Sequence, residues 1–280
     1  MTFTVTILGC GSSAGVPRVG GAGAKARDAG ITGDWGACDP ANPKNRRLRC
    51  SIHVARRGAE GETGLLVDTG PDLREQLLAA DVSHLDAVLY THEHADHTHG
   101  IDDLRAVALG MRRRLDVYAD AHTLALLRER FGYCFATPPG SGYPPILAAH
   151  LLEHAVPVSF TGAGGAVDVL PVRVNHGDID SLGFRFEAED KAFAYMPDVK
   201  RVPQAGIDLL RGLDLLIVDA LRYTPHPSHF SLDDALALIR EVRPRRALLT
   251  DLHADLDHEE LSARLPDGVE AAYDGLRIGL

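Results

Sequence analysis

The segment Thr91-His92-Glu93-His94-Ala95-Asp96-His97 follows a short apolar stretch that we expect to be a strand. In an extended segment residues i and i+2 point the same way, so His92 and His94 can present their imidazoles to one point. Asp96 is a residue type favoured at helix N-caps, and His97 falls in the first turn of the helix that we expect next. Both side chains can therefore face a second point nearby. The pattern predicts two metal ions that share one cleft.

These histidines could instead be solvated loop residues. Without a cation, however, three imidazoles and a carboxylate within six residues would bring like charges together at low pH. The chain also contains 14 histidines, several of them near carboxylates. We therefore predict that the motif binds metal.

The composition, with 45% hydrophobic and 24% charged residues, is typical of a globular protein. We predict a single domain over residues 1–280, because layered α/β folds often use this much chain as one unit. The 29 basic and 39 acidic residues give a net charge of −10, which would repel nucleic acid, so we expect no DNA partner. The four cysteines form no C-x-x-C pair, and we expect free thiols.

The first residues alternate like a strand and carry no basic residue ahead of an apolar core, which argues against a secretory signal. No apolar run approaches the roughly 18 residues needed to cross a bilayer. We therefore expect a cytoplasmic protein with no membrane partner.

Apolar alternation and turn residues predict strands and helices in both halves of the chain. The predicted strands cover residues 4–8, 51–56, 65–68, 86–91, 115–118, 167–174, 183–187, 191–195, 215–219 and 246–250. The predicted helices cover residues 71–80, 121–131, 231–242 and 259–265, with one more after the histidine motif. Because strands dominate each half and helices occur in both, we predict an α/β fold of two sheets packed face to face with helices outside.

Two stretches without periodicity interrupt this pattern. Residues 18–49 read as a long surface loop, and loops of that length are usually functional or disordered. The insert at 132–155 contains a run of Pro and Gly that breaks regular structure. We interpret this insert as a lid or as a contact in a homodimer.

The H-x-H-x-D-H pattern at residues 92–97 resembles the defining motif of the metallo-β-lactamase superfamily. The segments Leu8–Pro17 and Leu66–Gly70 precede it in the order expected for that superfamily. The resemblance covers nearly all the chain and implies a four-layered αββα sandwich, the metallo-β-lactamase fold. Within the superfamily the chain looks most like the PhnP-type phosphodiesterases, a group of phosphonate metabolism related to tRNA 3′-end nucleases.

The resemblance also implies further metal ligands. A lone histidine after a strand matches His176, and an aspartate that bridges two ions matches Asp198. The last motif departs from the usual Thr-His, because residues 250–253 read Thr-Asp-Leu-His. In an extended segment residues 251 and 253 lie on the same side, so we expect His253 to reach the second ion.

Two alternatives at the last motif stay open, namely ligation by Asp251 and by His258. The expected ligands are His92, His94 and His176 for the first ion, Asp96, His97 and His253 for the second, and Asp198 for both. Nitrogen and oxygen donors without thiolate suit zinc or manganese, and also iron. We expect two divalent ions as cofactors.

Three residues are expected to take part in catalysis. By resemblance, Asp68 holds the second nitrogen of a ligand histidine and fixes its tautomer. Asp96 is included both as a ligand and as a catalytic residue. His229 is expected by resemblance to be a non-ligand histidine near the scissile phosphate, where it could protonate the leaving oxygen. The alternative is a surface histidine beside a helix cap, with His226 as the next candidate.

Two ions can lower the pKa of a bridging water and neutralise charge on a phosphodiester during in-line attack. We therefore expect a phosphodiesterase for small cyclic or nucleoside phosphodiesters. A thioester or lactone hydrolase would need the same metal site, but a thiolate leaving group hardly needs an acid such as His229. A non-catalytic metal-binding or carrier protein of the same fold is the third hypothesis.

Overall fold

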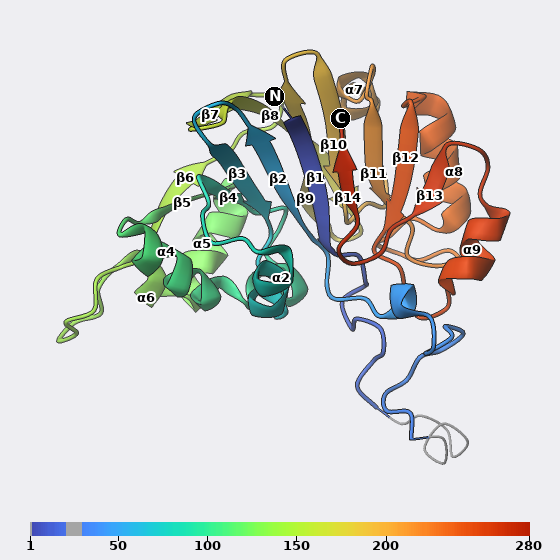
Figure 1. Cartoon of the computed structure of the whole chain (residues 1–280), viewed down its shortest axis with the longest axis horizontal. Helices are drawn as coiled ribbons and strands as arrows, with labels where there is room; N and C mark the ends of the chain where they lie inside the picture. The colour runs from blue at the N-terminus through green and yellow to red at the C-terminus, as the bar shows by residue number, and fades with distance from the viewer. Residues whose placement is uncertain (1, 21–29) are drawn as a thin grey trace.

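Two seven-stranded sheets pack face to face in the computed structural model, which describes residues 2–20 and 30–280 (Figure 1). Part of the predicted loop at 18–49 therefore lies outside the described residues. The first sheet has the order β14-β1-β2-β3-β4-β5-β6, and the second has the order β13-β12-β11-β10-β9-β8-β7.

The first sheet consists of β1 (Thr2–Gly9), β2 (Ser51–Arg57), β3 (Glu62–Val67), β4 (Ala87–Leu89), β5 (Leu115–Ala119), β6 (Leu147–Leu151) and β14 (Arg277–Gly279). The second consists of β7 (Val158–Gly162), β8 (Gly165–His176), β9 (Ile179–Ala188), β10 (Lys191–Met196), β11 (Leu215–Asp219), β12 (Arg246–Thr250) and β13 (Val269–Ala271). The α-helices are α2 (Leu73–Ala80), α3 (Ala95–Thr98), α4 (Leu104–Met111), α5 (Ala121–Arg130), α6 (Gly132–Phe135), α7 (Gln204–Leu209), α8 (Leu232–Val242) and α9 (His258–Arg264). Short 3-10 helices cover Pro43–Asn45 and Ile101–Asp103.

The main core lies between the sheets because alternate residues of each strand point inward. Val5 and Ile7 of β1 pack in one cluster with Phe184 and Phe186 of β9, and all four are buried. Complete burial of each such side chain stabilises the fold by about 1.5–3 kcal/mol. The opposite faces of both sheets are also apolar, so each sheet needs a second cover.

Helices cover these outer faces. Leu73 of α2 and Leu104 of α4 pack with Leu66 on the first sheet, while Ala235 and Leu238 of α8 pack on the second. The prediction of a four-layered αββα sandwich is thereby confirmed. Within the described part of the chain, none of the helices combines the length and the apolar character that a membrane span requires.

The carboxyl ends of parallel strands meet at one end of the sandwich. In the first sheet β3 and β4 are parallel, and in the second β10, β11 and β12 are parallel. Ligands of open α/β sheets bind outside such strand ends. The segments that leave these five strands carry most of the predicted site residues.

The insert at 132–155 supplies α6 and then β6, the edge strand of the first sheet. Residues 137–146 between them have no regular structure, as the run of Pro and Gly predicts. A role for this insert as a lid or a homodimer contact stays a prediction.

Candidate metal centre

The histidine motif begins where β4 ends. The structure starts α3 at Ala95, so His94 and not Asp96 occupies the N-cap position, because the His94 backbone is still extended (φ −61°, ψ 151°). His92 Nε2 and His94 Nδ1 converge to 2.9 Å, as the alternation of side chains predicts. Asp96 and His97 follow in the first turn, where Asp96 Oδ2 lies 3.5 Å from His97 Nε2.

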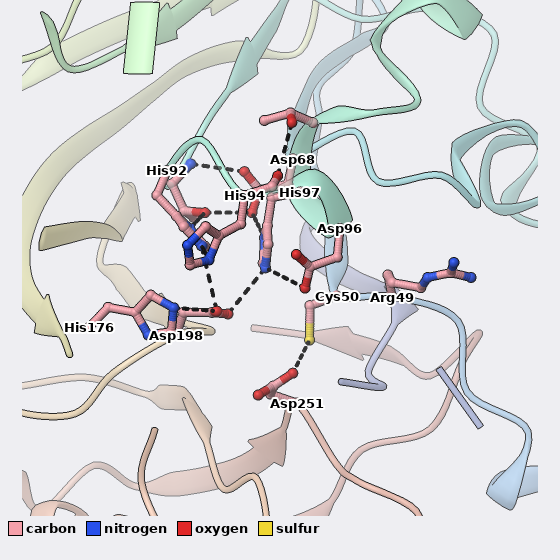
Figure 2. A network of polar contacts seen from close by, with 12 residues as sticks. Arg49, Cys50, Asp68, His92, His94, Asp96, His97, His176, Asp198 and Asp251 are labelled. Atoms are coloured by element: carbon pink, nitrogen blue, oxygen red, sulfur yellow. Dashed lines mark hydrogen bonds and ion pairs between the residues drawn. The ribbon is translucent and has the colours of Figure 1, made fainter. Parts of the chain in front are cut away.

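Four of the predicted ligands form a tight group. His92, His94, His176 and Asp198 offer ligand atoms that all lie within 4.8 Å of one another. Asp198 Oδ2 is 3.7 Å from His92 Nε2 and 3.4 Å from His176 Nε2. Figure 2 shows these side chains pointing toward one another from separate segments.

Hydrogen bonds on the far side of two imidazoles fix their tautomers. The Ser228 carbonyl can only accept, so His176 Nδ1 donates to it at 2.7 Å and Nε2 keeps its lone pair. His97 Nδ1 likewise donates to Asp68 Oδ2 at 2.7 Å. Both Nε2 atoms then face the carboxylate of Asp198, at 3.4 Å and 3.3 Å. Lone pairs opposed to a carboxylate at these distances repel unless a cation lies between them.

The buried polar atoms also indicate that a cation binds at this position. Asp198 Oδ1 is buried and has no hydrogen-bond partner among the described residues, although a buried carboxylate without a partner is costly. Imidazole nitrogen and carboxylate oxygen are the donors that zinc, manganese and iron accept. The residues present therefore fit a divalent ion, as the sequence predicts.

The electrostatics keep His92 and Asp198 in the forms that bind metal and surround His97 with negative charge. Burial, followed by the nearby His97, holds the pKa of His92 well below its ordinary value, so His92 is neutral. Burial of Asp198 acts to raise its pKa, but His97 and His92 outweigh it and the pKa falls well below the usual range. For His97, burial is outweighed by Asp198, Asp96 and Asp68, and its pKa rises well above the ordinary value. This much negative charge around one imidazole attracts a cation.

Asp68 lies against two parts of the motif. Besides His97, its carboxylate accepts hydrogen bonds from the Thr91 amide and hydroxyl, each at 2.8 Å. Asp68 follows β3, has a left-handed backbone (φ 64°) and is completely buried. The contact expected with a ligand histidine is present, and the catalytic role of Asp68 stays a prediction.

A second group consists of Asp198, His229 and Asp251. His229 Nδ1 donates to Asp219 Oδ2 at 2.8 Å and lies 3.1 Å from Asp251 Oδ2, while Nε2 lies 4.0 Å from Asp198 Oδ2. Burial lowers the pKa of His229, but Asp251 and Asp219 outweigh it and raise the pKa to about 12. His229 therefore carries a positive charge between buried carboxylates.

The position of His229 is set by the start of α8. Ser231 is the N-cap residue, and its hydroxyl accepts from the Asp234 amide while the Asp234 carboxylate accepts from the Ser231 amide. This capping box fixes the chain two residues after His229. The next candidate, His226, has its Nδ1 3.3 Å from the Ser228 amide.

The structure does not bring His253 to the centre. Its Nε2 lies 3.0 Å from Arg18 and its Nδ1 lies 3.2 Å from Asp255. The prediction assumed an extended segment after β12, but Asp251 has a left-handed backbone (φ 59°) that turns the chain. Asp251 faces the centre instead. His258 is buried against Tyr273, with ring centroids 5.9 Å apart.

The sequence alone assigned no role to two residues that lie near the centre. Asp219, the last residue of β11, is completely buried and holds His229. Cys50 is buried with its thiol 3.9 Å from Asp251 Oδ1. An acidic residue that ends a wholly apolar strand is a signal that could have identified Asp219, whereas nothing in the sequence separates Cys50 from the other cysteines.

Comparisons with known proteins match the chain to a family model and to a solved structure. The model of the beta-lactamase superfamily domain matches residues 63–251. A crystal structure of a new diphosphatase from the PhnP family has a TM-score of 0.83 and 34% identity, and covers 100% of this chain and 98% of that one.

Two curated relatives match over shorter shares of their length. The octanoyltransferase of Porphyromonas gingivalis is 33% identical over 273 residues, which are 96% of this chain and 50% of that protein. Ribonuclease Z of Bradyrhizobium diazoefficiens is 30% identical over 173 residues, which are 58% of this chain and 54% of that protein. The chain thus spans about half the length of these relatives.

Proposed function

Because the chain belongs to the metallo-β-lactamase superfamily and is PhnP-like, we propose that this hydrolase is a metal-dependent phosphodiesterase for small cyclic or nucleoside phosphodiesters. The observation that carries the proposal is the position of His229. Its Nδ1 is held by Asp219, which leaves Nε2 directed at Asp198 in the metal centre. A proton donor placed there serves an alkoxide leaving group, which needs protonation more than a thiolate does.

When bound, divalent ions would neutralise charge on a phosphate oxygen and make a water more acidic. His92, His94, His176 and Asp198 would hold one ion, and His97 faces Asp198 Oδ1 with Asp96 beside it. Side chains of the protein carry out the remaining steps. Asp68 orients His97 through Nδ1, and Asp219 orients His229 in the same way. His229 then delivers its Nε2 proton to the departing oxygen.

The net charge of −10 favours small substrates over polymeric RNA, since a negatively charged surface gives no general attraction for a polyanion. Two relatives carry the names diphosphatase and ribonuclease Z, which both refer to phosphate-containing substrates and support the same reaction class. Another relative is named as an octanoyltransferase, so acyl substrates are also tested.

A hydrolysis screen tests the proposal. The protein loaded with zinc or manganese is offered a cyclic nucleotide, a nucleoside phosphodiester, a diphosphate diester, a thioester and a lactone. We expect turnover of the phosphodiesters and its loss in His92→Ala, while His84→Ala, which alters an exposed histidine, keeps activity. Turnover of the thioester or the lactone, but of no phosphodiester, would reject the proposal in favour of a thioester or lactone hydrolase. Bound ions without hydrolysis of any substrate would favour a non-catalytic metal-binding protein.

A further inference from the structure

We propose that Asp251 is the ligand that completes the second metal position, and that it makes this position oxygen-rich, so that the two halves of the centre select different ions. The inference rests on the proposed function, because it assumes that the centre holds two ions. It concerns which side chain of this unusual last motif binds, and which class of ion follows from that choice.

Asp251 is placed as a ligand should be. It follows β12, and its left-handed backbone turns the side chain inward, where it is 3% exposed. Its Oδ1 lies 3.9 Å from the Cys50 thiol, a contact drawn in Figure 2. Its Oδ2 is buried and lies 3.1 Å from His229 Nδ1, but it accepts no well-aligned hydrogen bond within residues 2–20 and 30–280. One oxygen therefore contacts the thiol, and the other contacts only His229, whose Nδ1 already donates to Asp219, so this oxygen can accept an ion.

The surrounding carboxylates require a cation. Asp198, Asp219 and Asp251 are all buried, and each has one oxygen without a hydrogen-bond partner in the described structure. Ligand atoms of Asp198 and Asp251 lie within 4.8 Å of each other. Two imidazole rings face these three carboxylates, because His229 contacts all of them and His97 Nε2 lies 3.3 Å from Asp198 Oδ1. Buried charges that lack compensation are strongly destabilising, and a divalent ion between Asp198 and Asp251 supplies the missing positive charge.

The donor sets of the two positions then differ. The first has three imidazole nitrogens and one carboxylate, from His92, His94, His176 and Asp198. In this proposal the second would have three carboxylates and one imidazole: Asp96 and Asp198 lie 3.5 Å and 3.3 Å from His97 Nε2, and Asp251 lies within 4.8 Å of Asp198. Nitrogen donors suit zinc, whereas carboxylate donors suit harder ions such as manganese. We therefore expect zinc in the first position and manganese in the second.

Metal content measures this directly and without reference to activity. Wild-type protein and three variants, Asp251→Ala, Asp251→His and His253→Ala, are equilibrated with equal zinc and manganese and analysed by elemental analysis and by electron paramagnetic resonance of manganese. Wild type should hold both metals. Asp251→Ala should keep zinc, which shows that it folds, and bind manganese at least about 100-fold more weakly. Asp251→His should take zinc at both positions, and His253→Ala should resemble wild type.

Other results overturn the inference. Loss of an ion in His253→Ala but not in Asp251→Ala would restore His253 as the ligand. Unchanged manganese preference in Asp251→His would reject the donor argument. A His229→Ala variant that loses the second ion would show that His229 fills the position assigned to Asp251. Wild type that binds no metal at all would instead remove the proposed function.

Discussion

Among the described residues, Asp198 belongs to each of the two groups that could hold a cation. Its two oxygens face different partners, since Oδ2 lies near His92 and His176 while Oδ1 lies 3.3 Å from His97. His229 Nε2 lies 4.0 Å from the same Oδ2, and the His229 ring packs against His176 with ring centroids 4.6 Å apart. A leaving group bound near this oxygen would therefore lie beside both the metal ligands and a proton donor.

This arrangement predicts how His229→Ala behaves. The variant should keep its ions but hydrolyse a phosphodiester with an alkyl leaving group about 10² to 10⁴ times more slowly, which is the usual contribution of a general acid. A p-nitrophenyl ester should be slowed much less, because p-nitrophenolate leaves without a proton. Steady-state rates on the two substrates, with metal content measured in parallel, check this.

Asp219→Asn tests the same role indirectly, since it removes the negative charge that holds His229 Nδ1 and keeps the shape of the side chain. It should reproduce the same dependence on the leaving group in weaker form. An equal loss on both substrates in His229→Ala would make His229 a phosphate-binding residue. No loss on either would leave it as an ordinary histidine beside a helix cap.

At the same scale, the sequence predicted part of the centre. The spacing of His92 and His94 was sufficient to predict that their imidazoles converge, because both side chains leave one extended segment on the same side. The resemblance supplied His176 and Asp198, which the fold brings together from distant strands. The choice between Asp251 and His253 depended on one backbone angle, the φ of 59° at Asp251, which no spacing rule contains.

Among the structural elements, the described end of the long loop, up to residue 49, contacts the turn after β12. The Arg47 side chain is 1% exposed and donates to the Leu256 and His253 carbonyls at 2.6 Å and 3.2 Å. It also donates to Asn45 Oδ1 at 3.3 Å. A region that reads as a surface loop in sequence is thereby anchored next to Asp251 by a buried guanidinium.

Arg47→Met should therefore destabilise the protein by about 3 kcal/mol, because it leaves buried carbonyls without donors. Urea unfolding at constant metal concentration measures the change, and Arg46→Ala, a neighbouring exposed arginine, is the control with an expected change within about 0.5 kcal/mol. Arg47→Lys should recover only part of the loss, since one ammonium cannot reach all three acceptors. Equal stability of Arg47→Met and Arg46→Ala would show that the hydrogen bonds of Arg47 do not stabilise the fold.

Long apolar elements were predictable at this scale and short ones were not. The strand at 215–219 and the helix at 231–242 were found within a residue of β11 and α8, because a wholly buried run and a capped amphipathic face give strong signals. Edge strands such as β6 and β14 were missed, since they have few buried residues. Their pairing depends on neighbours distant in sequence.

For the molecule as a whole, the centre joins the two sheets. Asp68, His92 and His97 leave strands of the first sheet, while Asp198 and Asp251 leave strands of the second. The resemblance and the alternation of strands and helices together predicted this architecture, because both sheets need helical covers. An ion bound between residues of both sheets would stabilise the folded state alone, since the unfolded chain does not bring these ligands together.

Removal of metal should therefore lower the thermal stability of the whole protein. An ion at 100 times its dissociation constant contributes about 2.7 kcal/mol. At about 2–4 °C per kcal/mol for a chain of roughly this size, chelation should lower Tm by roughly 5–10 °C, and added zinc or manganese should restore it. Scanning calorimetry before and after chelation measures this shift. Asp198→Ala, which removes the shared carboxylate, should start at the lower Tm and change little on chelation. The coupling between the metal centre and the two sheets would be refuted by a wild-type Tm that is the same with and without bound metal, because a ligand that binds the folded state alone must raise it.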